Sequence, residues 1–296
     1  MSKQVSLVLS GGGARGIAHI GVLEELERRG YKIHSVVGTS MGALVGGVYA
    51  LGKLDEFKKW LFKLDKRKVF SLVDFTFSKQ GLVRGDKVLE AMKQFIPDTN
   101  IEDLPIGYGA VAVDILKGEE RLLDKGSVYE AIRASIAIPT VFTPKKSETT
   151  LLVDGGVLNN IPVNHASRIP DDLLVAINVN ADVPPEISND QNKIARANNN
   201  KYLENIAQFY EQLKRLVGTR EQKEQPETLG YFDLINKTIT LMMTRIADNS
   251  LERYKPDILI KVSSESASIF DFYKAEKLVE EGREVAKKAL DQINFK

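Results

Sequence analysis

Residues 5–16, VSLVLSGGGARG, open the chain with a short apolar run, three consecutive glycines and an arginine. The aliphatic run at 5–9 ends at the glycines, which predicts a buried strand followed by a tight turn. Residues 17–29 then carry apolar side chains at helical spacing. A second apolar strand at 32–37 and a helix of small residues at 41–51 come next. This early alternation of strands and helices predicts an α/β fold whose strands run parallel.

The rest of the chain continues this pattern and contains a predicted insertion. We expect a core domain over 1–185, a helical insertion or cap over 186–250, and a C-terminal strand and helix over 251–296 that complete the core. Residues 182–200, rich in proline and asparagine, predict a loop. The other predicted elements are a helix at 86–96, a hairpin at 106–123, a helix opened by a capping box of Ser127 and Glu130 and ended by Pro139, buried strands at 150–153 and 173–179, helices at 205–217 and 231–247, a strand at 257–262 and a closing helix at 268–290.

Composition excludes several classes of protein. The 296 residues include 41 basic and 40 acidic side chains, so the net charge of +1 argues against a nucleic-acid partner. The chain has no cysteine, which excludes disulfides, thiolate nucleophiles and cysteine-ligated metals. It has three histidines, His19, His34 and His165, too few to favour a histidine metal site. We therefore expect no metal and no cofactor.

No segment predicts a membrane span or a targeting signal. The longest uncharged stretch, at 33–52, contains five glycines and suits a strand, a turn and a buried helix better than a spanning helix. The apolar run within residues 1–9 is too short for a signal peptide. We therefore expect a cytoplasmic protein.

The glycine loop at 11–16 fits two kinds of site. Gly11, Gly13 and Gly16 match the fingerprint of a dinucleotide-binding loop, but the acidic residue expected at the end of the second strand is missing. The backbone amides of such a loop suit a developing oxyanion equally well. A cation in a first helical turn is unfavourable, so Arg15 indicates either an anionic partner or a structural bond to a loop carbonyl.

Residues 38–42, GTSMG, match the G-x-S-x-G nucleophile elbow between a predicted strand and a predicted helix. In this motif the glycines permit a strained turn that presents the serine, here Ser40. The structural alternative is an ordinary strand–helix turn in which Ser40 caps the helix.

The base that would activate Ser40 is not an obvious histidine. An α/β-hydrolase places its histidine late in the chain, whereas no histidine follows His165. Asp154 ends the predicted strand at 150–153 and precedes two glycines. The carboxyl ends of parallel strands share one edge of the sheet, so Asp154 is expected beside Ser40. The alternative is that Asp154 is only a turn residue.

Together, GGGARG at 11–16, GTSMG at 38–42 and DGG at 154–156 resemble the patatin-like phospholipase family. The segments ASIAIP at 134–139 and NNIP at 159–162 are also similar to that family. The resemblance covers about residues 5–180, and the C-terminal remainder carries no recognisable motif.

The resemblance implies a three-layer α/β/α fold, with 1–185 as the catalytic core, and a Ser–Asp dyad. Ser40 would attack an ester carbonyl, and Asp154 would take the hydroxyl proton. An unperturbed aspartate is a poor base at neutral pH, so burial would have to raise its pKa. The residues implied in oxyanion or substrate binding are Gly11, Gly12, Gly13, Ala14, Arg15 and Gly16, and those that support the elbow are Gly38, Met41, Gly42, Gly155 and Gly156.

Residues 53–77 are a candidate for peripheral contact with the inner face of a membrane. The part at 53–68 has seven basic and three acidic residues, a net charge of +4, and aromatic side chains interleave with the cations. The alternative is an amphipathic helix packed on the core with solvated lysines. Both this segment and the helix at 231–247 are candidates to line an acyl-chain groove.

The function implied is a serine acyl hydrolase that acts on a lipid ester: a phospholipid, a lysophospholipid or an acylglycerol. An acyltransferase would use the same serine and the same oxyanion loop. A non-catalytic module that binds a lipid or a nucleotide at the glycine loop is the third alternative.

Overall fold

The computed structural model describes residues 3–72, 86–139, 141–187 and 231–293. Its centre is a sheet in which five parallel strands are neighbours in the order β3, β2, β1, β7 and β8. The parallel strands are β1 (Gln4–Leu9), β2 (Lys32–Thr39), β3 (Gly107–Asp114), β7 (Leu173–Ala181) and β8 (Ile258–Ser263). The prediction of a mostly parallel sheet is confirmed.

Three short strands join the sheet in antiparallel directions: β4 (Glu119–Leu123), β5 (Lys145–Lys146) and β6 (Leu151–Asp154). β3 and β4 form the predicted hairpin. The strand predicted at 150–153 exists as β6, but the expectation that it runs parallel is wrong, because β6 pairs antiparallel with β3.

The pairing along β3 puts β2 and β6 on the same edge of that strand. Ala110 and Val111 pair with both β2 and β4, so β2 and β4 lie on opposite edges. The next three residues, 112–114, pair with both β4 and β6, so β6 also lies opposite β4. β6 therefore occupies the stretch of edge just beyond the end of β2.

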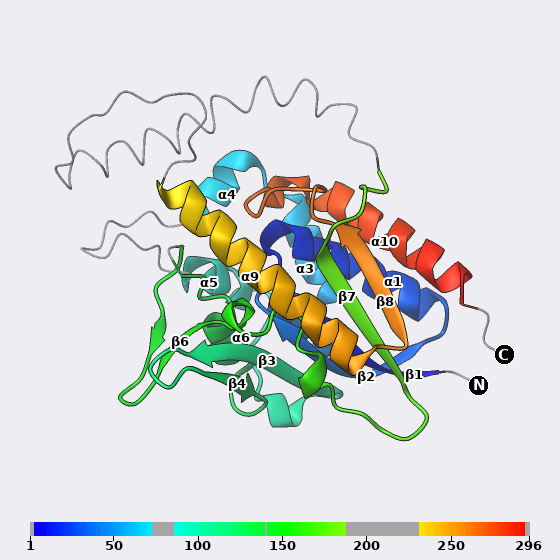
Figure 1. The fold of residues 1–296 in the computed structure, drawn as a ribbon, viewed down its shortest axis with the longest axis horizontal. Helices are drawn as coiled ribbons and strands as arrows, with labels where there is room; N and C mark the ends of the chain where they lie inside the picture. The colour runs from blue at the N-terminus through cyan, green and yellow to red at the C-terminus, as the bar shows by residue number, and fades with distance from the viewer. Residues whose placement is uncertain (1–2, 73–85, 140, 188–230, 294–296) are drawn as a thin grey trace. The chain divides into compact units, whose positions relative to one another are not determined.

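Helices cover both faces of the sheet (Figure 1). One face carries α1 (Ala18–Arg28), α2 (Met41–Ala50), α3 (Leu54–Phe62), α6 (Val128–Ser135) and α10 (Ala275–Asp291), with α4 (Lys66–Leu72) and α5 (Asp86–Lys93) beside them. The other face packs against the part of α9 (Tyr231–Tyr254) that contains Ala247 and Leu251. Short 3-10 turns are η1 (Gly13–Ile17), η2 (Ile101–Asp103), η3 (Gly155–Val157), η4 (Val163–His165) and η5 (Phe272–Lys274). None of the helices in the described ranges is both long and apolar enough to cross a bilayer.

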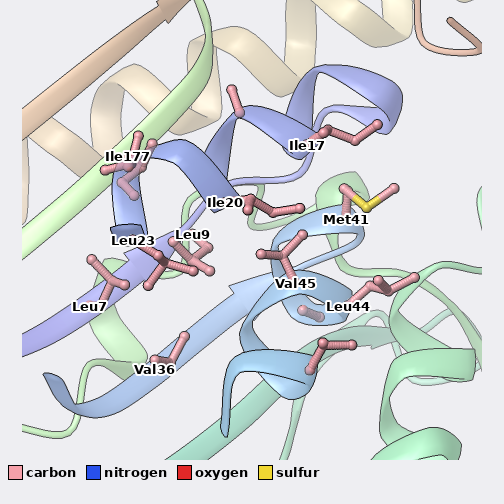
Figure 2. Packing of buried hydrophobic residues seen from close by; sticks show 14 of the residues in the cluster. Leu7, Leu9, Ile17, Ile20, Leu23, Val36, Met41, Leu44, Val45 and Ile177 are labelled. Atoms are coloured by element: carbon pink, nitrogen blue, oxygen red, sulfur yellow. The ribbon is translucent and has the colours of Figure 1, made fainter. Parts of the chain in front are cut away.

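The alternation of side chains along the strands separates two cores. Leu7 and Leu9 of β1 face the helices α1 and α2 (Figure 2), whereas Val8 faces a smaller cluster that includes Ile161 and Ala247. Because successive side chains of a strand point to opposite faces, an apolar strand is buried on both sides. The predicted three-layer α/β/α architecture is confirmed.

Several predicted boundaries shift. The Ser127 hydroxyl accepts a hydrogen bond from the Glu130 amide, as a capping residue should, but the helix ends at Ser135 and not at Pro139. The closing helix begins at Ala275 instead of 268, because the preceding residues form turns and η5. The helix predicted at 231–247 extends to Tyr254, and Met242 within it is 59% exposed. The helix predicted at 205–217 and most of the loop at 182–200 lie outside the described residues.

Contacts divide the chain into two units, Met1–Glu186 with Ile239–Lys296, and Ile187–Thr238. By this division, residues 239–250 of the insertion expected at 186–250 belong to the first unit and not to the second.

Helices α1 and α10 cross at two glycines. A Cβ on Gly282 would lie 1.9 Å from the carbonyl oxygen of Ala18, and a Cβ on Gly21 would lie 1.9 Å from that of Val279. The two backbones approach so closely that only glycine fits at either position.

We predict that Gly282→Ala destabilises the protein by about 1–3 kcal/mol, the usual range for an overpacked core. In a helix with room for a methyl group the same change would add stability. Urea unfolding followed by circular dichroism measures the effect. Lys287→Ala, on the exposed side of α10, is the control and should change stability by less than about 0.5 kcal/mol. A Gly282→Ala variant as stable as the control would contradict the close crossing.

Candidate active site

Ser40 occupies the turn between β2 and α2 in a strained backbone conformation. Its φ and ψ are 54° and −121°, in the left-handed region that favours glycine. Its amide donates a 2.9 Å hydrogen bond to the hydroxyl of Ser135, and that hydroxyl donates at 2.6 Å to the carbonyl of Val111. The Ser40 side chain makes no capping bond to α2. Ser40 therefore occupies the N-cap position of α2, as the alternative proposed, but its hydroxyl does not serve as the cap.

The glycines around Ser40 let neighbouring segments approach. A Cβ on Gly42 would lie 2.3 Å from the Leu9 carbonyl oxygen, and one on Gly38 would lie 2.4 Å from the Gly42 backbone. The motif at 38–42 thus forms the strand–turn–helix geometry that a nucleophile elbow requires. Met41 packs against Gly16 of the glycine loop, where a Cβ would lie 2.3 Å from Met41 Cγ.

Asp154 reaches the same place from the opposite direction. It pairs with Ala112, while the last residue of β2, Thr39, pairs with Val111. Since β2 and β6 share one edge of β3, Ser40 and Asp154 lie where the two strand ends meet. The expectation that Asp154 lies beside Ser40 is therefore supported by this register, although the parallel-strand argument behind it is wrong.

Gly155 and Thr39 stabilise the place where the ends of β2 and β6 meet. A Cβ on Gly155 would lie 2.3 Å from the Val111 carbonyl oxygen, so a larger residue would push β6 away from β3. The Thr39 hydroxyl donates a 2.8 Å hydrogen bond to the carbonyl of Asn159. The segment after Asp154 is thereby tied to the end of β2.

The carboxyl group of Asp154 is buried, with 5% of the residue exposed. Its Oδ1 accepts a 2.8 Å hydrogen bond from the Gly156 amide, and its Oδ2 has no hydrogen-bond partner among the described residues. Burial raises the pKa of Asp154 to about 6, against the opposing effects of the Ser40 hydroxyl and the Gly156 amide. Asp154 ends β6 and caps the turn η3 through Oδ1, which agrees in part with the turn alternative, and its Oδ2 is left without a hydrogen bond among the described residues.

The amides of the glycine loop differ in what they bind. The Gly11 amide donates to the carbonyl of Asn160 at 3.0 Å, and the Ala14 amide donates to the carbonyl of Ile269 at 2.9 Å. The amides of Gly12 and Gly13 make no hydrogen bond within the described part of the chain. Among the residues implied in oxyanion or substrate binding, Gly11 and Ala14 therefore have amide donors that are already occupied.

Arg15 makes structural bonds to backbone and side chain. Its guanidinium donates to the carbonyls of Val179 and Ala267 and to Oδ1 of Asn180, at 2.6–3.3 Å. Asn180 in turn donates to the carbonyl of Gly11 at 2.6 Å. Of the two interpretations of Arg15, the structure shows the bond to loop carbonyls. The arginine holds the glycine loop to the end of β7 and to the segment before α10.

Sequence reasoning missed three residues that position the site: Ser135, Asn160 and Asn180. The segments 134–139 and 159–162 pointed to the first two, although without a role. Asn180 lies at the carboxyl end of a parallel strand, the edge where ligand-binding residues gather, and that rule could have identified it.

A cavity of about 100 Å³ adjoins Ser40 and Gly13. Apart from these residues its lining is apolar. It comes from α2, α3, α4, α5, η5 and the segments that follow α3 and α6: Met41, Leu44, Phe57, Trp60, Leu61, Leu64, Val69, Leu72, Val88, Ile136, Ile138, Phe142 and Phe272. The inner face of α3 thus forms a wall of the cavity, whereas the described part of the other candidate, the helix at 231–247, contributes no residue to its lining. Such a lining suits a hydrocarbon chain next to a polar reaction centre.

None of the three histidines lines this cavity. Burial lowers the pKa of His19 to about 4, and its neutral ring contacts the Ser10 carbonyl through Nε2 at 2.9 Å. His34 and His165 pair with Asp172 and Glu120 and line a separate cavity of about 470 Å³. Within the described ranges, no three His, Asp or Glu side chains are grouped to hold a metal ion.

Comparisons with known proteins agree with the motifs. The family model of the patatin-like phospholipase matches residues 7–167. An uncharacterised NTE family protein of Mycobacterium tuberculosis is 33% identical, over 99% of this chain and 93% of that protein. The lysophospholipase nte1 of Emericella nidulans is 32% identical, over 60% of this chain and 12% of that protein. The crystal structure of VipD from Legionella pneumophila aligns with a TM-score of 0.48 at 16% identity, covering 98% of this chain and 67% of that one.

The family model covers more than half of the chain, and the mycobacterial relative is similar over 99% of this chain and 93% of its own length. The chain belongs to the patatin-like phospholipase family.

Proposed function

We propose that the protein is a serine acyl hydrolase that cleaves a carboxylic ester of a lipid through an acyl-enzyme on Ser40. The observation that carries the proposal is the meeting of Ser40 with a buried Asp154 at one edge of β3, beside an apolar cavity. Membership of a phospholipase family supports lipid hydrolysis, and one relative is named a lysophospholipase.

Acylation begins with attack of the Ser40 hydroxyl oxygen on the ester carbonyl carbon. Asp154 takes the hydroxyl proton through Oδ2, and the carbonyl oxygen gains a negative charge. The amides of Gly12 and Gly13 stabilise that charge, and each such donor typically lowers the barrier by about 3 kcal/mol. The intermediate then collapses, the bond to the leaving alcohol breaks, and Asp154 returns the proton to the alcohol oxygen.

Deacylation repeats these steps with water. Asp154, ionised again, takes a proton from a water molecule that attacks the acyl carbon. The bond to the Ser40 oxygen breaks, the proton returns to that oxygen, and a free fatty acid leaves. An acyltransferase would use an alcohol in place of the water, so the product separates the two reactions.

The raised pKa of Asp154 suits this cycle. An aspartate with a pKa of about 6 is largely ionised at neutral pH and accepts a proton more readily than an exposed aspartate. Removal from solvent is the main cause of the shift, so the base strength depends on the buried junction between β2 and β6.

The cavity indicates the substrate class. Its apolar lining fits an acyl chain whose ester group rests at Ser40. Phospholipids, lysophospholipids and acylglycerols share that chemistry. A long-chain ester should therefore bind more tightly than a short-chain ester of the same alcohol.

We predict that Ser40→Ala abolishes hydrolysis of p-nitrophenyl acyl esters. Asp154→Asn should lower kcat/KM by about 10²–10⁴-fold, the usual contribution of a general base. The amide keeps the acceptor for the Gly156 amide, so the fold is preserved, and circular dichroism checks this. Activity that survives in Asp154→Asn would remove Asp154 from the mechanism. Ester binding without turnover by the wild type would favour the non-catalytic module.

We predict that kcat/KM rises with pH through a midpoint of about 6, because the base must be ionised and the pKa of Asp154 is raised to about 6. The same shift acts on stability in the opposite sense. Between the unfolded pKa near 4 and the native pKa near 6, rising pH costs the wild type stability, since the native state must bury a charge.

The stability of Asp154→Asn should lack that loss, so its advantage over the wild type should grow between pH 4 and pH 7. Rate profiles and urea unfolding at each pH test both effects. A rate midpoint near 4, the range of an exposed carboxyl group, would show that Asp154 is not a buried base.

We predict that Ser135→Ala lowers kcat by about tenfold and leaves KM nearly unchanged. The reason is that the Ser40 amide loses its acceptor and the elbow relaxes, a loss of about 1 kcal/mol or more. Ser35→Ala is the matched control, because the Ser35 hydroxyl is also buried and donates at 2.9 Å to a carbonyl, that of Ser167. The control should lose stability without losing kcat. Equal kcat losses in both variants would indicate a general effect of destabilisation.

A further inference from the structure

The elements that wall the Ser40 cavity are basic on their outer side. Phe57 and Leu61 of α3 and Val69 of α4 are buried and line the cavity. Lys63, Lys66, Arg67 and Lys68 lie on the exposed side of the same segment. Residues 53–68 carry a net charge of +4 in a chain whose total is +1, so positive charge is concentrated beside this cavity.

A second segment, residues 268–274, extends this surface. It contacts α3 and α4 through η5, and Lys66 Nζ lies 4.8 Å from the centre of the Tyr273 ring. Phe272 of this segment lines the cavity, and Ile269 is 39% exposed. Figure 1 shows α4 and the turn before α10 side by side.

The segment 268–274 is also tied to the candidate oxyanion loop. The Ile269 carbonyl accepts the Ala14 amide, and the side chain of Ile269 lies within 2.9 Å of where a Cβ on Gly13 would be. An apolar side chain at the surface is therefore held next to the reaction centre. Phe62, 38% exposed at the end of α3, adds a second exposed apolar group.

We infer that this surface, formed by 58–69 and 268–274, docks the protein onto a membrane that contains anionic lipid. The inference rests on the proposed function, since a lipid ester must reach Ser40 from such a membrane. Lysine and arginine side chains bind anionic headgroups, while aromatic and aliphatic side chains between them enter the interface. An acidic protein would satisfy the cations but would leave Ile269 and Phe62 without an apolar partner.

On this proposal the two interpretations of residues 53–77 are compatible. Helix α3 packs on the core through Phe57 and Leu61, as in the amphipathic alternative, and the exposed cations that follow it at 63–68 provide the membrane contact. Residues 73–77 lie outside the described residues and have no part in the inference.

Flotation with vesicles tests the docking surface. The probe is full-length Ser40→Ala protein, which leaves the lipids intact, with vesicles of phosphatidylcholine alone or of equal parts phosphatidylcholine and phosphatidylglycerol. We expect binding to the anionic vesicles and its loss at high salt. The triple variant Lys63→Glu, Lys66→Glu and Arg67→Glu should bind at least about 100-fold more weakly, since each cation contributes a factor of about five.

The control carries the same change of charge elsewhere, Lys117→Glu, Lys125→Glu and Lys287→Glu, all at exposed positions. It should bind more tightly than the surface variant by at least about tenfold. If both triple variants bound the vesicles equally weakly, binding would depend only on the net charge of the protein. That result would overturn the docking surface. With Ser40 intact, the surface variant should hydrolyse a short soluble ester at the wild-type rate.

The single tryptophan, Trp60, reports whether lipid meets the cavity. We expect phosphatidylglycerol with brominated acyl chains to quench the Trp60 fluorescence of the probe protein. The same lipid should not quench Trp60 in the triple variant Lys63→Glu, Lys66→Glu and Arg67→Glu. Absence of quenching and of vesicle binding, with soluble-ester hydrolysis intact, would overturn the docking surface and leave the proposed function standing. If the wild type did not hydrolyse the soluble ester at all, the proposed function itself would be refuted. Binding to polyglutamate but not to anionic vesicles would identify an acidic protein partner and overturn the inference.

Discussion

The hydroxyl of Ser135 joins the segments on which the site depends. It accepts a hydrogen bond from the strained Ser40 amide and donates one to the Val111 carbonyl. Val111 lies at the point along β3 where the ends of β2 and β6 meet. Ser135 itself comes from the last turn of α6. One buried side chain thus links the elbow, the central strand and a helix, and it offsets part of the cost of holding Ser40 in a left-handed conformation.

The buried carboxyl group of Asp154 makes stability and chemistry oppose each other. Raising its pKa from 3.8 to about 6 corresponds to about 3 kcal/mol against the charged form. The close packing of Gly155 and the bond from Thr39 to Asn159 keep the group in place despite this penalty. The same burial supplies the base strength that an exposed aspartate lacks, so the tight strand junction serves the proposed reaction directly.

The C-terminal part of the chain completes the glycine loop even though it carries none of the family's motifs. Ala267 and Ile269 accept hydrogen bonds from Arg15 and Ala14, and Phe272 closes one side of the cavity. These bonds occupy the Ala14 amide and the Arg15 guanidinium and so fix the loop. The amides of Gly12 and Gly13 make no such bond within the described residues.

The sequence by itself determined the fold class and most strands and helices, and it identified Ser40 and Asp154 as candidates for one site, because these follow from apolar spacing and short glycine motifs. Local pattern could not determine the direction of β6, since a strand of four residues reads the same in either direction. It also left open whether Arg15 binds an anion, and it did not show that the amides of Gly11 and Ala14 are occupied. Tertiary structure decided these points and the pKa of Asp154, because each depends on burial and on partners far away in the chain, such as Asn180 and Ala267 for Arg15.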